Sequence, residues 1–106
     1  MSEHVRIILA ELRRRFEALY GPRLVRMVLF GSQARDDAEP GSDIDVLVVL
    51  SGEVRMGEEI ERTADDVVAV SLEYDETVAC VFVTQHEFET ERSPLLLNVR
   101  REGVAL

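Results

Sequence analysis

The sequence contains no lysine, only one cysteine and no long apolar run, and each of these absences excludes a class of protein. All twelve basic residues are arginine, which excludes lysine-based catalysis and the phosphate-binding loop that ends in Gly-Lys-Ser/Thr. Cys80 cannot form a disulfide within the chain, and its apolar neighbours indicate a buried, inert thiol. No apolar run approaches the roughly 20 residues of a membrane helix, so no membrane association is expected.

Basic residues are also few relative to acidic ones, and the formal net charge is −9. General nucleic-acid binding depends on neutralising phosphates, so this balance argues against direct contact with nucleic acid. It permits metal binding and a basic protein partner, in a homo- or hetero-oligomer. The N-terminal segment is amphipathic and contains acids, unlike a secretory signal, and we therefore expect a cytoplasmic protein.

The length of 106 residues predicts a single domain over 1–106. Apolar runs at 24–30, 43–50 and 77–83 predict strands, the last one central by its composition. Short helices are expected over 33–37, 85–90 and 94–101, before Gly103. Spacings of three and four predict two longer amphipathic helices, whose apolar residues are Val5, Ile8, Leu9, Leu12, Phe16 and Leu19 in the first and Met56, Ile60, Ala64, Val67, Val68 and Leu72 in the second.

The lengths of the connections predict how the strands pair. The second and third strands are joined by a helix, so they should be parallel with a right-handed crossover. The connector between the first two strands is too short for such a helix, which favours an antiparallel pair. The expected fold class is α+β, with a mixed sheet of three or four strands packed against helices.

Asp43 and Asp45 open the second strand and supply the first half of a candidate site. Because they are two residues apart on a strand, their side chains leave the same face of the sheet, while Ile44 points into the core. Two carboxylates this close repel each other unless a cation lies between them. Such oxygen ligands favour Mg²⁺ or Mn²⁺.

Gly31 and Ser32 follow the first strand and supply the second half. Glycine allows the backbone to approach a ligand closely. The amides of Ser32 and Gln33, at the start of a helical turn, suit an anion, and Ser32 adds a hydroxyl donor. A nucleoside triphosphate with its metal fits both halves. The plainer alternative is that Gly-Ser is only a turn and that the two acids keep a strand soluble.

The stretch GSQAR followed by SDID resembles the nucleotidyltransferase superfamily typified by DNA polymerase β. The length and the C-terminal stretch HEFETERSPLLLNVRREGVAL are similar to those of minimal nucleotidyltransferase (MNT) domains. The resemblance implies that Asp43 and Asp45 are catalytic and hold the metals. It implies that Gly31, Ser32 and Gln33 bind the phosphates of ATP as substrate. Arg35 matches the family's arginine, and either contacts phosphate or pairs with a nearby aspartate.

Two departures from the family pattern affect this reading. Many members have glycine after the arginine, where this chain has Asp36. Active members often carry a third carboxylate on the strand at 77–83, which here contains no acid. Asp75 or Glu76 could take that role, although both also fit as loop acids. Without this group, catalysis would be slow, the base would come from a partner, or the domain would only bind nucleotide.

Small MNT proteins are typically encoded beside a HEPN-family partner in toxin–antitoxin pairs. The resemblance therefore implies an antitoxin that transfers AMP from ATP to a hydroxyl of a HEPN-type toxin, a role that suits an acidic surface. One alternative is a catalytically weak or inactive nucleotide-binding module that neutralises the partner by complex formation. Another is a subunit that modifies small molecules such as aminoglycosides.

Overall fold

The computed structural model describes residues 1–106 and has the expected α+β architecture. None of its helices has the length and apolar character needed to cross a membrane. Ser2 caps the first helix through its side chain, as its sequence position indicates. The elements in chain order are α1 (Glu3–Tyr20), η1 (Gly21–Arg23), β1 (Leu24–Phe30), α2 (Ser32–Arg35), β2 (Ile44–Leu50), α3 (Met56–Tyr74), β3 (Val78–Thr84), α4 (Gln85–Thr90), α5 (Pro94–Glu102) and β4 (Val104–Ala105).

The sheet has four strands in the order β3-β2-β1-β4. β1 and β2 are antiparallel and β2 and β3 are parallel, which confirms both pairings predicted from the connections. The short β4 adds a fourth strand, antiparallel to β1. The prediction that the third strand is central is wrong, because β3 lies at the edge of the sheet. Its apolar residues are explained by α3, which packs along it, rather than by a second neighbouring strand.

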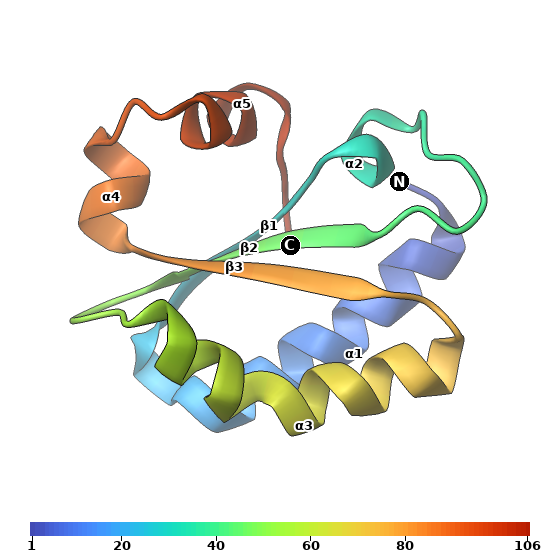
Figure 1. The fold of residues 1–106 in the computed structure, drawn as a ribbon, viewed down its shortest axis with the longest axis horizontal. Coiled ribbons are helices and arrows are strands. Elements are labelled where there is room, and N and C mark those ends of the chain that lie inside the picture. The colour runs from blue at the N-terminus through green and yellow to red at the C-terminus, as the bar shows by residue number, and fades with distance from the viewer.

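Helices cover both faces of the sheet, with α1 and α3 on one side and α4 and α5 on the other (Figure 1). β2 runs between these layers, and every residue in it except Asp45 is buried. Val46 and Val48 pack in a core with α1, whereas Leu47 and Val49 pack against α5. The continuous apolar run of β2 therefore reflects burial on both faces.

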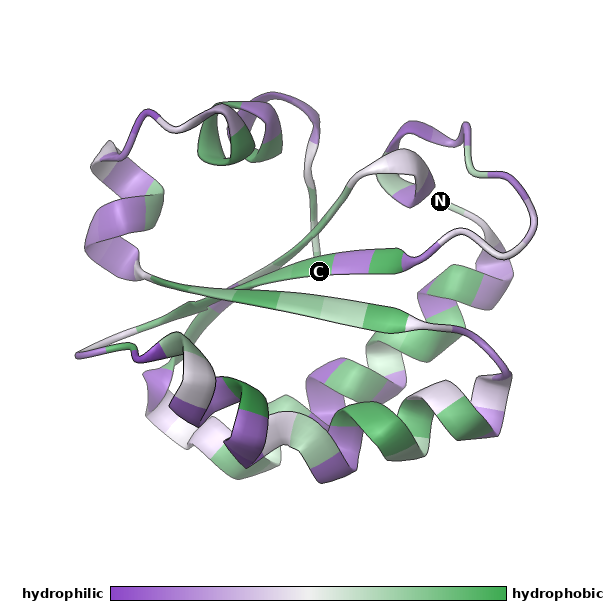
Figure 2. Ribbon diagram, in the orientation of Figure 1, coloured by the Kyte–Doolittle hydropathy of each residue, from purple (hydrophilic) through white to green (hydrophobic).

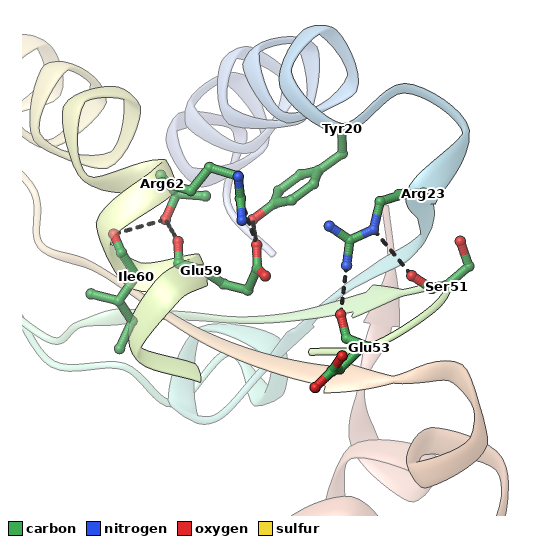
Figure 3. A network of polar contacts seen from close by, with 8 residues as sticks. Tyr20, Arg23, Ser51, Glu53, Glu59, Ile60 and Arg62 are labelled. Carbon is green, nitrogen blue, oxygen red and sulfur yellow. Dashed lines mark hydrogen bonds and ion pairs between the residues drawn. The ribbon is translucent and has the colours of Figure 1, made fainter. Parts of the chain in front are cut away.

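The buried side of α1 follows its apolar spacing except at its last turn. Leu19 is 40% exposed, and Tyr20 is buried in its place. The Tyr20 hydroxyl donates to Glu59 of α3 at 2.7 Å, and Arg62 Nε donates to the same carboxylate at 3.0 Å (Figure 3). Burial alone would raise the pKa of Glu59, but these two hydrogen bonds and the positive charges of Arg62 and Arg23 together outweigh burial, and the pKa lies below its ordinary value.

The apolar stripe that identifies α3 is not the buried side of that helix. Glu59, Thr63 and Val70 are buried, while Ile60 and Val68 are more than half exposed. The polar side chains tolerate burial because each has a partner, Tyr20 for the Glu59 carboxylate and the Glu59 carbonyl for the Thr63 hydroxyl. Spacing predicted the helix correctly but did not predict its orientation.

Candidate active site

β2 begins at Ile44, so Asp45 is its second residue and Asp43 lies just before it. The Ile44 side chain is fully buried with α1, as predicted. Because side chains alternate along a strand, Asp45 faces the opposite side of the sheet, where α2 and α5 lie. Asp45 is half-buried and Asp43 is exposed. The strand therefore directs Asp45 away from the core while Ile44 anchors it.

Gly31 lies directly against Asp45, the nearer of the two acids. Phe30, the last residue of β1, is paired in register with Asp45. Gly31 has φ +77°, and a Cβ atom at this position would lie 2.5 Å from Asp45 Oδ2. Only glycine combines this backbone conformation with so close an approach. The Gly-Ser turn and the acidic pair, 14 residues apart at Gly31 and Asp45, thus belong to one site.

Gly31 is also the residue that precedes α2 and accepts its first backbone hydrogen bonds. The amides of Ala34 and Arg35 donate to the Gly31 carbonyl at 3.1 and 3.3 Å. The amides of Ser32 and Gln33 have no partner inside the helix, as at any helix start, and are available to an anion. Gln33 Nε2 donates to the Ser42 carbonyl at 3.5 Å, which links α2 to the residue before Asp43.

The loop between α2 and β2 explains the departure at Asp36. Asp36 has φ 60° and ψ 27°, a left-handed conformation that glycine adopts freely and that aspartate tolerates better than most residues. Further along, the amide of Ser42 donates to the Glu39 carbonyl, and the Ser42 hydroxyl accepts from the Glu39 amide. This reciprocal pair forms the turn that leads into Asp43.

Arg35 contacts acids of this chain. Its Nε lies 3.1 Å from Asp37, and its Nη1 lies 3.5 Å from Glu102 at the end of α5. Pairing with Asp37 is one of the alternatives that the sequence left open. Glu102 was not foreseen, because nothing in local spacing connects residues 35 and 102. Arg35 therefore ties the α2 loop to the C-terminal helix.

The electrostatics of the acidic pair favour a bound cation. Burial raises the pKa of Asp45, and the neighbouring negative charge of Asp43 raises it further. A divalent cation would relieve both effects, since it compensates the lost hydration and neutralises the repulsion. Two carboxylates, one of them packed against Gly31, are a donor set suited to Mg²⁺ or Mn²⁺.

No third acid accompanies this pair. Ala79 of β3 is the register partner of Asp45 on the same face of the sheet. Asp75 has φ 52° and caps α3 through its amide, which donates to the Ser71 carbonyl. Glu76 lies 3.3 Å from His4 Nε2. No group of three or more His, Cys, Asp or Glu side chains in the structure is arranged to hold a metal ion.

The mixed sheet brings the Gly-Ser turn against Asp45, the arrangement that the resemblance to nucleotidyltransferases implies. Comparison with protein families supports this directly, because the model of the nucleotidyltransferase domain matches residues 8–98. The chain therefore belongs to the nucleotidyltransferase domain family. No curated protein matches the sequence.

Solved structures share the fold at low sequence identity. A toxin–antitoxin structure with AMP-PNP aligns over 98% of this chain and 72% of its own, at 18% identity and a TM-score of 0.65. A mutant of the MntA-HpeT toxin–antitoxin aligns over 98% and 71%, at 18% identity and a TM-score of 0.61. An assigned nucleotidyltransferase from Sulfolobus solfataricus aligns over 99% and 86%, at 19% identity and a TM-score of 0.60. These neighbours confirm the MNT-type fold.

Proposed function

We propose that this domain transfers AMP from ATP to a hydroxyl group of a partner protein, in a reaction that requires Mg²⁺ or Mn²⁺. The partner would be a HEPN-type toxin, and this chain its antitoxin. The observation that supports the proposal most strongly is the contact between Gly31 and Asp45, which joins a phosphate-binding turn to a cation-binding pair. Toxin–antitoxin structures among the neighbours, one of them with AMP-PNP, favour this reaction over other nucleotidyl transfers.

Each residue of the site has a role in this proposal. Asp43 and Asp45 would hold the cation, which supplies neutralising charge for the leaving group and activates the acceptor oxygen. The amides of Ser32 and Gln33 and the Ser32 hydroxyl donate to the β- and γ-phosphates. Gly31 leaves the space that the Asp45 carboxylate occupies beside the turn, and Arg35 holds the loop through Asp37.

The transfer itself forms one bond and breaks one. The acceptor oxygen bonds to the α-phosphorus, the bond from that phosphorus to the bridging oxygen breaks, and pyrophosphate leaves with the bonding electrons. The acceptor proton passes to a base outside this chain, because β3 presents Ala79 and no carboxylate beside Asp45.

The test combines the full chain, ATP labelled on the adenosine, Mg²⁺ and the protein encoded by the adjacent gene. We expect label on that protein and release of pyrophosphate, both lost in Asp43→Asn and Asp45→Asn. Glu39→Gln, which removes an exposed acid from the same loop, is the matched control and should retain transfer. Absence of nucleotide binding at millimolar ATP and Mg²⁺ would contradict the proposal.

A second candidate is a module that neutralises its partner by binding alone. Ala79 beside Asp45 favours it, because this is where a third carboxylate would complete the site. In the same assay, this function predicts a tight complex without label that Asp43→Asn leaves unchanged.

A further inference from the structure

An apolar groove runs between α3 and the edge strand β3, on the face of the sheet opposite to Asp45. Its volume is about 340 Å³, and eight of its nine lining residues are hydrophobic. Val78, Cys80 and Phe82 form one wall, on the face of β3 that packs toward α3. Ile60, Val67 and Val68 of α3 contribute to the other wall. Burial raises the pKa of the Cys80 thiol to about 12, so this cysteine contributes an apolar surface rather than a nucleophile.

The outer rim of the groove exposes large apolar side chains on a single helix. Ile60 is 51% exposed and Val68 is 54% exposed, and Leu72, one helical turn beyond the groove, is 77% exposed. Hydrophobic segments recur along α3, beneath β3 (Figure 2). Clustered apolar exposure of this kind marks interaction surfaces more often than scattered exposure does.

The acids on this side of α3 lack partners within the chain. One face of α3 carries four side chains that follow one another at intervals of four, three and four residues: Glu61, Asp65, Val68 and Leu72. Both acids are exposed and make no ion pair, and the same is true of Glu73. The other acids of α3 are paired, Glu58 with Arg55, Glu59 with Arg62 and Asp66 with Arg15.

Two amides on the outer edge of β3 already have partners in α3, so another strand could not pair along the whole of this edge. The amide of Val78 donates to Ser71 Oγ, and the amide of Phe82 donates to Met56 Sδ, each at 3.4 Å. Strand addition would have to displace both α3 side chains. The groove therefore suits apolar side chains presented by a helix better than it suits an added strand.

We infer that this groove docks a helical segment of the partner protein that carries apolar side chains on one face and arginine or lysine beside them. Unpaired Glu61 and Asp65 complement the basic residues, and the apolar side chains fill the groove. A second copy of this chain is disfavoured, because it would bring another net charge of −9 and the same acids against each other. This inference rests on the proposed function, since it names the surface that recognises the partner.

The groove also lies close to the site of transfer. β3 alone separates it from β2, and Ala79 lines the groove while pairing in register with Asp45. Adjacent strands are about 4.8 Å apart. A partner seated in the groove would reach the acids by crossing the outer edge of β3, so that one docked protein would be both bound and modified.

The probe is a pair of synthetic helical peptides with the same leucine face, one with arginine and one with glutamate on its flanks. We expect the arginine peptide to bind the full chain at least about tenfold more tightly than the glutamate peptide. Ile60→Asp and Val68→Asp should each weaken that binding by about tenfold. Ile7→Asp is the matched control, because Ile7 is 50% exposed on α1, outside the groove.

Four results would overturn the inference. They are absence of binding by the arginine peptide, equal binding of both peptides, unchanged binding by the two groove variants, or a wild-type dimer in sedimentation that Val68→Asp dissociates. Thermal unfolding checks that the variants fold. Titration with ATP and Mn²⁺ separates this inference from the proposed function. The groove variants should bind nucleotide normally, and Asp45→Asn should lose nucleotide but retain the peptide.

Discussion

Gly31 combines a φ of +77° with the position at which a Cβ would lie 2.5 Å from Asp45 Oδ2. Gly31→Ala therefore carries a backbone penalty of about 1–3 kcal/mol and also displaces a proposed cation ligand. We expect it to weaken binding of ATP with Mn²⁺ by about tenfold or more, measured by titration calorimetry.

Gly52→Ala is the matched control for this substitution. Gly52 has φ +79°, but a Cβ there would meet no atom within 4 Å. The control should lose similar thermal stability and keep nucleotide binding. Equal nucleotide binding by both variants would show that the contact with Asp45 has no functional role.

The raised pKa of Asp45 makes a prediction about stability. Burial and the Asp43 charge raise this pKa in the folded chain, so ionised Asp45 destabilises the fold above its folded pKa. The penalty disappears as the pH falls below the unfolded value of about 3.9. Without metal, Asp45→Asn should therefore melt no lower than wild type at pH 7, and the difference should shrink toward pH 3. A markedly lower melting temperature at pH 7 would assign Asp45 a structural role.

Among the elements, α1 and α3 are joined by a buried polar contact, and its stability should depend on pH. The pKa of Glu59 is depressed because the hydrogen bonds from Tyr20 and Arg62, together with the charges of Arg62 and Arg23, outweigh burial. Its contribution is thus present above the unfolded pKa of about 4.3 and is lost as the pH falls through the folded value. We expect Glu59→Gln to lower the free energy of unfolding by about 1–3 kcal/mol at pH 7.

Urea unfolding at pH 7 and pH 3 tests this prediction, since the difference between wild type and Glu59→Gln should be smaller at the lower pH. Glu58→Gln provides the control, because Glu58 is exposed and pairs only with Arg55 at 3.6 Å. Exposed pairs of this kind contribute little to stability. An equal effect of both substitutions would contradict the role assigned to the buried contact.

The register between β2 and β3 determines where a third carboxylate could act. Ala79 lies beside Asp45 on the same face, so Ala79→Asp places a carboxylate next to the proposed cation ligands. We expect tighter Mg²⁺ binding and faster transfer to the partner than in wild type. Ala79→Asn has nearly the same size without the charge, and it should give neither gain. If Ala79→Asp behaves like Ala79→Asn in both measurements, the missing acid does not limit this site.

For the whole molecule, the net charge of −9 is the property that most affects association. Screening weakens attraction between exposed charges, since the Debye length falls from about 10 Å at 0.1 M salt to about 3 Å at 1 M. Binding of the arginine peptide should therefore slow steeply as NaCl is raised, measured by stopped-flow fluorescence. Replacing Glu61 and Asp65 by glutamine should flatten this dependence. If the double substitution leaves the salt dependence of peptide binding unchanged, then Glu61 and Asp65 are not the acids that attract the peptide.

Local spacing alone was sufficient for most secondary structure and for selecting the residues of the candidate site. The runs at 24–30 and 43–50 are strands, and the two amphipathic periods are helices, because both depend on side chains a few residues apart. The pairing of strands also followed, since connection length limits which strands can be parallel. Gly31, Ser32, Asp43 and Asp45 stood out for the same reason, as residue types at short and recognisable spacings.

Contacts between residues distant in sequence decided which helix faces are buried, which strand lies at the edge of the sheet and which residues of the site lie together. Glu59 is buried because Tyr20, 39 residues away, supplies a partner, and this contact turns Ile60 and Val68 outward against their hydrophobic pattern. β3 is an edge strand because no further strand pairs beyond it, whatever its composition. The approach of Gly31 to Asp45 likewise depends on the register of β1 and β2. Burial and proximity are properties of pairs of segments, and the order of residues within one segment does not determine them.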